Sequence, residues 1–361
     1  MKIKLIIYLF AKQTIEVNKK CNFLLQACCK TGTNLPNIEQ APQQLNTQSF
    51  DDFNCSILKP DQTQPNMISN AKFLFNFMNQ SHTLDIAFGI NVSFYQQSPQ
   101  IENELVLVTL SKKGKYKIPR VPNLTDVVMY PPIHYKVDDI IYVGGLKDNQ
   151  RNGYGLQYWK SGAFYEGEWK NDKANGQGRL IYEDGDMYEG EWKDDKAEGK
   201  GSFYYFDGES YIGDWLEDLP HGKGKEEWPD GTTYEGDFIY GKKVGKGMYK
   251  FADGGQYVGD FGDNQMQGMG KYTWPDKKIY EGQWIQGKME GQGKLKWPDG
   301  KNYDGSYVNG KKEGYGTLTF ADGRQYVGQW KEGLMHGIGT FKDKDNIKQG
   351  EWYEGRFNRE S

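Results

Sequence analysis

The sequence predicts an all-β fold, a single-layer and solenoid-like ribbon of β-hairpins that follows a non-repeating N-terminal segment. Three observations carry this prediction: a 23-residue unit recurs nine times without a gap, every copy contains a Gly-x-Gly pair, and glycine and aromatic residues are abundant. A fixed period without insertions indicates one supersecondary unit stacked along an axis. Such an array favours an extended binding surface over a single catalytic cleft. The copies begin at Tyr142, Tyr165, Tyr188, Tyr211, Tyr234, Tyr257, Tyr280, Tyr303 and Tyr326.

Each unit is predicted to be a hairpin. In the second copy, Tyr165, Gly167 and Trp169 alternate with glutamates and so share one face of a strand. The eighth position of every copy is Gly, Asn or Asp, the residues that best tolerate positive φ, which places a tight turn there. Glycine inside the return strand is unfavourable unless something approaches the backbone closely. We therefore expect the rings of Tyr165 and Trp169 to lie over Gly176 and Gly178. No helix longer than a turn or two is predicted.

The chain divides into four predicted parts. Residues 1–83 are expected to be largely irregular or disordered, because residues 30–70 are rich in Asn, Gln, Thr and Pro. Residues 84–141 contain two strand candidates, 84–94 and 105–110, which would form a β-hairpin cap over the first repeat, followed by a proline-containing connector. Residues 142–347 are the nine repeats. Residues 348–361 are predicted to be a truncated tenth repeat or C-terminal cap.

Composition limits the classes of partner. The 45 Lys+Arg and 49 Asp+Glu give a net charge of −4, which argues against a chain-wide basic footprint for nucleic acid. All four cysteines lie in the first 60 residues, and their absence from the repeats favours a reducing, cytoplasmic setting. No apolar run approaches the ~20 residues that a membrane-spanning helix needs. The cysteines are Cys21, Cys28, Cys29 and Cys55, and lipidation of the Cys28–Cys29 pair stays open.

No catalytic, metal or cofactor site is predicted. His221 and His336 occupy the same repeat position five copies apart, where a polar surface residue is expected, and neither has a triad partner. The cysteines lack the paired spacing of a zinc site. The Gly-x-Gly pairs do not open a helix after a buried strand, so a phosphate-binding loop is not expected. The sequence therefore predicts a protein that is not an enzyme.

The unit that begins Tyr165-Glu-Gly-Glu-Trp-Lys resembles the MORN repeat (membrane occupation and recognition nexus), and the resemblance extends from Tyr142 to Ile347. Two copies depart from the pattern, with Leu146 in place of an aromatic residue and Lys277 in place of a turn glycine. MORN arrays occur in radial spoke head proteins of cilia, in junctophilins that bridge membranes and in cytoskeletal scaffolds. The resemblance implies a non-catalytic protein scaffold in a ciliary axoneme (radial spoke-like) or another cytoskeletal assembly.

In such arrays a grooved face holds a peptide or helix of a partner protein, which makes the repeated aromatic residues the candidate site. They have two interpretations: they form only the array's own core, or they also contact a partner, since Tyr and Trp are rigid anchors. The candidates are Tyr165, Trp169, Tyr188, Trp192, Tyr211, Trp215, Tyr234, Tyr257, Tyr280, Trp284, Tyr303, Tyr326 and Trp330.

Two alternative functions stay open. A peripheral membrane adaptor would bind anionic lipids such as phosphoinositides through lysines in the segments 241–246 and 310–312. The 31 Lys+Arg and 38 Asp+Glu from Tyr142 onward disfavour this alternative, because anionic membranes attract polybasic surfaces. A regulatory subunit of an enzyme complex would use the same extended surface.

Overall fold

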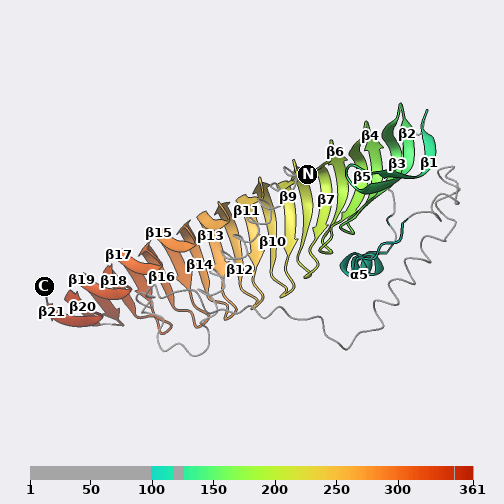
Figure 1. The fold of residues 1–361 in the computed structure, drawn as a ribbon. Helices are drawn as coiled ribbons and strands as arrows, with labels where there is room; N and C mark the ends of the chain where they lie inside the picture. The colour runs from blue at the N-terminus through green and yellow to red at the C-terminus, as the bar shows by residue number, and fades with distance from the viewer. Residues whose placement is uncertain (1–98, 115, 117–125, 345, 361) are drawn as a thin grey trace, which may run out of the picture. The chain divides into compact units, whose positions relative to one another are not determined.

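The computed structural model describes residues 99–114, 116, 126–344 and 346–360. The predicted irregular segment 1–83 and the predicted strand 84–94 lie outside these residues. The described chain forms two compact units, which meet in the sequence between Pro229 and Asp230. Each unit is built from antiparallel strands paired in sequence order (Figure 1), so the prediction of an all-β hairpin ribbon is confirmed.

The described residues of the unit that ends at Pro229 form one helix and nine strands. Each strand pairs with the next one along the chain, so that β4 pairs with β3 and with β5. The elements are α5 (Glu104–Lys113), β1 (Val128–Tyr135), β2 (Ile140–Lys147), β3 (Gln150–Trp159), β4 (Phe164–Lys170), β5 (Lys173–Ile181), β6 (Met187–Lys193), β7 (Lys196–Tyr204), β8 (Ser210–Leu216) and β9 (Leu219–Glu227).

Residues 230–344 and 346–360, which belong to the other unit, form twelve strands with the same pairing rule. The last hairpin, β20 and β21, pairs with β19 through Gly350 and Gly339. The strands are β10 (Thr233–Ile239), β11 (Lys242–Lys250), β12 (Gln256–Gly262), β13 (Gln265–Thr273), β14 (Ile279–Ile285), β15 (Lys288–Lys296), β16 (Asn302–Val308), β17 (Lys311–Thr319), β18 (Gln325–Lys331), β19 (Leu334–Asp343), β20 (Asn346–Tyr353) and β21 (Arg356–Glu360).

The turn inside each of the nine copies has positive φ at two consecutive residues, as in a type I′ turn. The eighth residue of each copy has the predicted positive φ, and the seventh residue has it as well, although it is Glu, Gln or Tyr in some copies. A type I′ turn matches the right-handed twist of the two strands, which explains why every copy uses it. The eighth residues are Asn149, Asp172, Asp195, Asp218, Gly241, Asn264, Gly287, Gly310 and Gly333, with φ between 60° and 89°.

The two glycines of each pair have different roles. Gly178 lies beneath the Tyr165 ring as predicted, because a Cβ there would lie 2.7 Å from Cζ of that ring. Gly176 does not, and this part of the prediction was wrong: a Cβ on Gly176 would meet the side chain of Glu168 instead. Its φ of 99° and the register shift beyond Gly167 place it in a β-bulge, where only glycine is unstrained.

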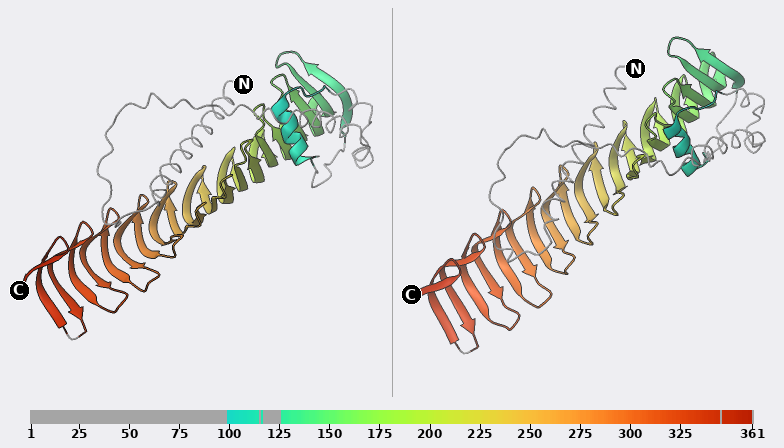
Figure 2. Two further views of the ribbon diagram at one scale, coloured as in Figure 1. Left: turned by 90° about the horizontal axis from the view of Figure 1, so that it is seen from below. Right: turned by 60° about the horizontal axis from the view of Figure 1, so that its bottom comes forward.

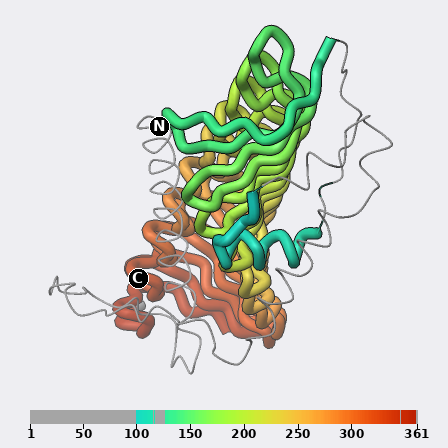
Figure 3. Tube along the Cα trace, turned by 45° about the vertical axis from the view of Figure 1, so that its right-hand side comes forward, coloured from blue at the N-terminus to red at the C-terminus, as the bar shows by residue number. Residues whose placement is uncertain are grey.

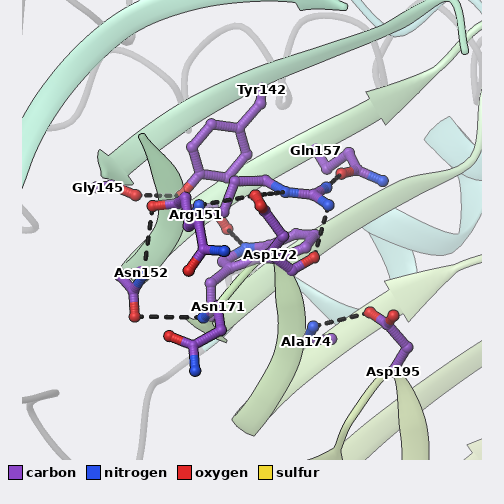
Figure 4. A network of polar contacts seen from close by, with 12 residues as sticks. Tyr142, Gly145, Arg151, Asn152, Gln157, Asn171, Asp172, Ala174 and Asp195 are labelled. Atoms are coloured by element: carbon purple, nitrogen blue, oxygen red, sulfur yellow. Dashed lines mark hydrogen bonds and ion pairs between the residues drawn. The ribbon is translucent and has the colours of Figure 1, made fainter. Parts of the chain in front are cut away.

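Adjacent repeats are connected at the hairpin turns. The carboxylate of Asp195 accepts a 2.9 Å hydrogen bond from the amide of Ala174, and the amide of Asp195 donates to the carbonyl of Ala174. Asp172 binds Arg151 in the same way, and its carboxylate also accepts from the Arg151 guanidinium at 3.2 Å (Figure 4). The Asp or Asn at the eighth position therefore links two repeats as well as forming a turn.

We expect substitutions of Asp195 to separate these two roles. Asp195→Ala removes the hydrogen-bond acceptor and places alanine, which tolerates the αL conformation poorly, at φ 69°. We expect this variant to lower the free energy of unfolding by about 2 kcal/mol. Asp195→Gly removes the acceptor but adopts positive φ without strain, so it lowers the free energy of unfolding by about 1 kcal/mol. Asp195→Asn keeps an acceptor and lowers it by less. Urea unfolding of the full chain measures the order; equal losses for alanine and glycine would show that φ does not matter here.

The N-terminal cap differs from the prediction. Residues 105–110 belong to the helix α5 and not to a strand, so the expectation of no helix longer than two turns was wrong. Asn103 caps the helix by accepting from the amides of Leu105 and Val106, and Gly114 ends it with φ 72°. The open edge of the first repeat is instead paired with β1, which lies in the predicted proline-containing connector and shifts register between Tyr130 and Ile133.

Candidate functional site

The thirteen candidate aromatic residues form the buried core of the array, and none of them exposes more than 8 % of its surface. The Tyr165 ring lies between two indoles in edge-to-face geometry, 5.1 Å from Trp169 and 5.4 Å from Trp192. The same contact repeats from copy to copy as a tyrosine ladder, with Phe238, Phe261 and Tyr307 in place of tryptophan. Each such pair stabilises the fold by about 1 kcal/mol in addition to the contribution of the apolar area that it buries.

Hydrogen bonds fix the first-position tyrosine of each copy. The Tyr188 hydroxyl donates to the carbonyl of Glu191 at 2.9 Å, and Nε1 of Trp192 donates to the carbonyl of Gly178 at 3.1 Å. Burial raises the pKa of six ladder tyrosines, that of Tyr326 to about 12, so their hydroxyls remain donors at neutral pH; the six are Tyr165, Tyr188, Tyr257, Tyr280, Tyr303 and Tyr326. The ladder holds the array together, and contact of its rings with a partner stays a prediction.

The opposite face of the repeats carries the helix. Arg179 pairs with Glu166 and Ile181 with Phe164, which places these side chains on the side away from the ladder. We call this side the helix-bearing face; it consists of positions 2, 4, 6, 13, 15, 17 and 23 of each copy. Figures 2 and 3 show α5 lying against one face of the first repeats.

An apolar patch on the helix-bearing face receives α5. Val106 and Leu107 of the helix are 0 % and 1 % exposed, and Leu110 is also buried. The patch is made by the first two copies and is lined by Val143, Tyr154, Leu156, Tyr158, Phe164, Ile181 and Met187. Burial of these side chains supplies most of the docking free energy, at about 25 cal/mol per Å² of apolar surface.

Polar anchors fix the position of α5 along the repeats. The anchors reach the loops 160–163, 182–186 and 205–209, which join one copy to the next. Asn103 Nδ2 donates to the carbonyls of Ser161 and Glu183, at 3.2 and 2.9 Å. Thr109 Oγ1 donates to the carbonyl of Gly185 at 2.7 Å, and Lys112 lies 5.0 Å over the Phe206 ring. The helix therefore runs along the repeat direction, from the first joining loop to the third.

One further anchor comes from the repeats themselves. Arg179 is 3 % exposed and donates at 2.7 Å to the carbonyl of Gly114, at the C-terminal end of α5. Its guanidinium is held by Glu189 at 2.8 Å and lies 5.2 Å from the Tyr116 ring. A buried cation at a helix C-terminus is favourable because the last carbonyls of the helix are unpaired.

The sequence prediction missed this helix site, although a signal for it was present. At positions 15 and 17 the first copy has Leu156 and Tyr158, whereas the fourth copy has Lys225 and Glu227. An apolar residue at a position that is charged elsewhere in the array indicates that something covers the face there. The roles of Asn103 and Thr109 depend on contacts with residues 58 to 80 positions away, which spacing does not reveal.

Neither a membrane-spanning helix nor a metal-binding cluster is found among the described residues. No helix in the segments 99–114 and 126–360 is long and apolar enough to span a bilayer. Within the same part of the chain, no group of three or more His, Cys, Asp or Glu side chains is placed to hold a metal ion.

Comparison with solved structures finds distant likenesses. The TCP10 domain of Danio rerio CPAP in complex with a STIL peptide is 14 % identical over 56 % of this chain and 96 % of that one, with a TM-score of 0.32. The TCP domain of Drosophila melanogaster SAS-4 in complex with a proline-rich motif of Ana2 is 15 % identical over 43 % and 84 %, with a TM-score of 0.29. At these TM-scores nothing about the partners of this chain follows from the likeness.

Family models give a clear result, whereas no curated protein matches the chain. The model described as "MORN repeat" matches nine consecutive segments between residues 142 and 347, which is more than half of the chain. The segments coincide with the nine copies whose turns, glycine pairs and tyrosine ladder are described above. The chain therefore belongs to the MORN repeat family.

Proposed function

We propose that this protein is a non-catalytic scaffold that binds segments of other proteins through the helix-bearing face of its MORN array. Membership of the family supports a protein-binding or membrane-associated repeat scaffold. The observation that carries the choice of protein binding is the docking of α5, which the repeats hold by a buried apolar patch and by loop carbonyls. The same two kinds of contact suit a helix from another chain.

Charge favours proteins over anionic membranes as partners. Residues 142–229 contain 11 Lys+Arg and 19 Asp+Glu, and residues 230–361 contain 20 and 19. Neither part has the basic excess by which a protein is attracted to anionic lipids, at about 1 kcal/mol per Lys or Arg. We expect no flotation of the full chain with phosphoinositide-containing liposomes at physiological salt. Flotation that salt abolishes would favour the membrane adaptor instead.

The proposed setting is the cytoplasm, in a cytoskeletal assembly, and the ciliary axoneme is the first structure to examine. This part of the proposal rests on the occurrence of MORN arrays in radial spoke head proteins. A tagged full-length chain is expected to localise to cilia in a ciliated cell and to be crosslinked to axonemal subunits. Localisation elsewhere, with partners from a soluble enzyme complex, would contradict the cytoskeletal setting and favour a regulatory subunit.

A further inference from the structure

Large apolar side chains gather on one face of residues 230–361. Six of them, at positions 6 and 13 of their copies, are 43–62 % exposed. Positions 6 and 13 point away from the tyrosine ladder, because successive residues of a strand alternate between its two faces. Ile285 lies five residues after Tyr280 of the ladder and so is on the opposite face. Tyr315 lies between Gly314 and Gly316, which pair with the ladder-side residues Trp330 and Gly328. We call these six residues the apolar stripe: Ile239, Met269, Ile285, Val308, Tyr315 and Ile338.

In residues 99–229, α5 covers the equivalent face of the first two copies. There the chain supplies its own helix, and the apolar side chains beneath it are buried. Within residues 230–344 and 346–360 every element is a strand, so no described element of this unit covers the stripe. Scattered exposed apolar residues are normal, but a row on one face of successive repeats is typical of a binding surface.

Lysines lie beside the apolar stripe on the same face, at positions 15 and 17, nearer to the loops that join the copies. These are Lys250, Lys271, Lys294, Lys296 and Lys342, and all five are exposed. The acidic residues interleaved with them are fewer, namely Glu235, Glu281 and Asp304, and Lys294 pairs with Asp304 at 2.9 Å. The border of the stripe thus has an excess of positive charge, which favours a partner with acidic residues at that edge.

We propose that the apolar stripe docks an amphipathic helix of a partner protein, laid along the repeat direction, with its apolar side on the stripe and acidic residues facing the lysines. This inference rests on the proposed protein-binding function and adds the site and the chemistry of the partner.

The repeat spacing fits a helix. One copy contributes two strands, a step of ~9.6 Å, which equals the rise of six to seven helical residues at ~1.5 Å each. A helix with apolar residues every seven positions therefore presents one anchor to each copy. Five copies, from Ile239 to Ile338, require about 26 residues by the same rise. The helix α5 shows a helix held across copies in this way: Asn103 bonds to two successive joining loops, at Ser161 and Glu183, and Thr109 bonds to the second of them, at Gly185.

A peptide library on the full chain tests the inference. The probe is a displayed set of 28-residue helices with leucine at heptad positions a and d, and with Glu, Gln or Lys varied at the flanking positions. We expect Glu-flanked helices to be enriched, and their binding to weaken at least tenfold in the double variant Ile285→Asp/Tyr315→Asp. Hydrogen exchange of the complex is expected to show protection within residues 239–338.

The matched control is Val128→Asp/Val137→Asp, which places two aspartates at exposed apolar positions outside the stripe and is expected to bind as the parent chain does. Circular dichroism checks that both double variants keep the parent's melting temperature. Enrichment of Lys-flanked helices, equal binding by the stripe variant, or no enrichment would overturn the inference. Binding of phosphoinositide vesicles that the stripe variant abolishes would also overturn it, in favour of a membrane.

Failure here and failure of the proposed function are distinguishable. If the stripe variant keeps every crosslinked partner of the parent chain in cells, the scaffold function stands and the stripe is not its site. If the parent chain itself is crosslinked to no protein, the proposed function fails.

Discussion

Gly293→Ala is expected to lower the free energy of unfolding by about 3 kcal/mol, at the upper end of what overpacking a core costs. A Cβ at this position would lie 2.5 Å from Cε2 and 2.6 Å from Cζ of Tyr280. That ring is fully buried and stands edge-to-face with Trp284 and Tyr307, each 5.2 Å away. It cannot yield without disturbing both neighbours, so the strain spreads to the adjacent copies.

Gly262→Ala is the matched control for this effect. Gly262 ends the ladder-forming strand β12, its φ is not positive, and the atom nearest to an added Cβ would be 3.4 Å away, in ordinary contact. We expect a change within about 0.5 kcal/mol of the parent chain. Urea unfolding followed by tryptophan fluorescence compares the two variants. Equal stability of both would show that close packing of rings on glycine is not what holds the array.

The repeats could be predicted from the sequence because their determinants are local. A turn that needs positive φ restricts the eighth residue to Gly, Asn or Asp, and the structure has positive φ at all nine. The second glycine of each pair was also explained correctly, since the ring that covers it belongs to the same hairpin. The bulge at Gly176 was missed because a register shift depends on pairing with Gly167 and Trp169, which alternation alone does not specify.

The helix site was not predictable in the same way. The segment around Leu105 to Leu110 contains Val106, Val108 and Thr109, whose β-branched side chains favour a strand. The helix forms because Asn103 caps it and because its apolar side is buried on the first two copies. Tertiary contacts thus outweigh local propensity, as they commonly do for short helices.

The burial of the ladder rings likewise changes which residues are candidates for partner contact. The sequence predicted partner contacts for Tyr and Trp at the first and fifth positions, because these residues recur most regularly. Their regularity reflects packing between copies, as the contacts of Tyr165 with Trp169 and Trp192 illustrate. Residues that vary between copies, such as Leu156 against Lys225, distinguish the covered part of the helix-bearing face from the open part.

Leu107→Asp is expected to release α5 from the repeats and to unfold the helix at the same time. Leu107 is 1 % exposed, and burying an unpaired carboxylate there costs more than the docking of one short helix provides. A free helix of ten residues with three β-branched members is marginal in water, so amides 104–113 should lose their hydrogen-exchange protection. The strands should keep theirs, because β1 still pairs with the edge of β2.

Leu105→Asp is the control within the same helix, because Leu105 is 40 % exposed and a carboxylate in the first helical turn is favourable. Protection of residues 104–113 should therefore match that of the parent chain. If amides 104–113 stayed protected in Leu107→Asp, then burial of Leu107 on the first two copies would not be what makes the helix form. If the variant also unfolded β3 to β6, α5 would be part of the core of this unit, and not a helix held on the surface of a preformed array. The expected outcome, a lost helix on an intact array, is the behaviour that a docking face for a separate helix requires.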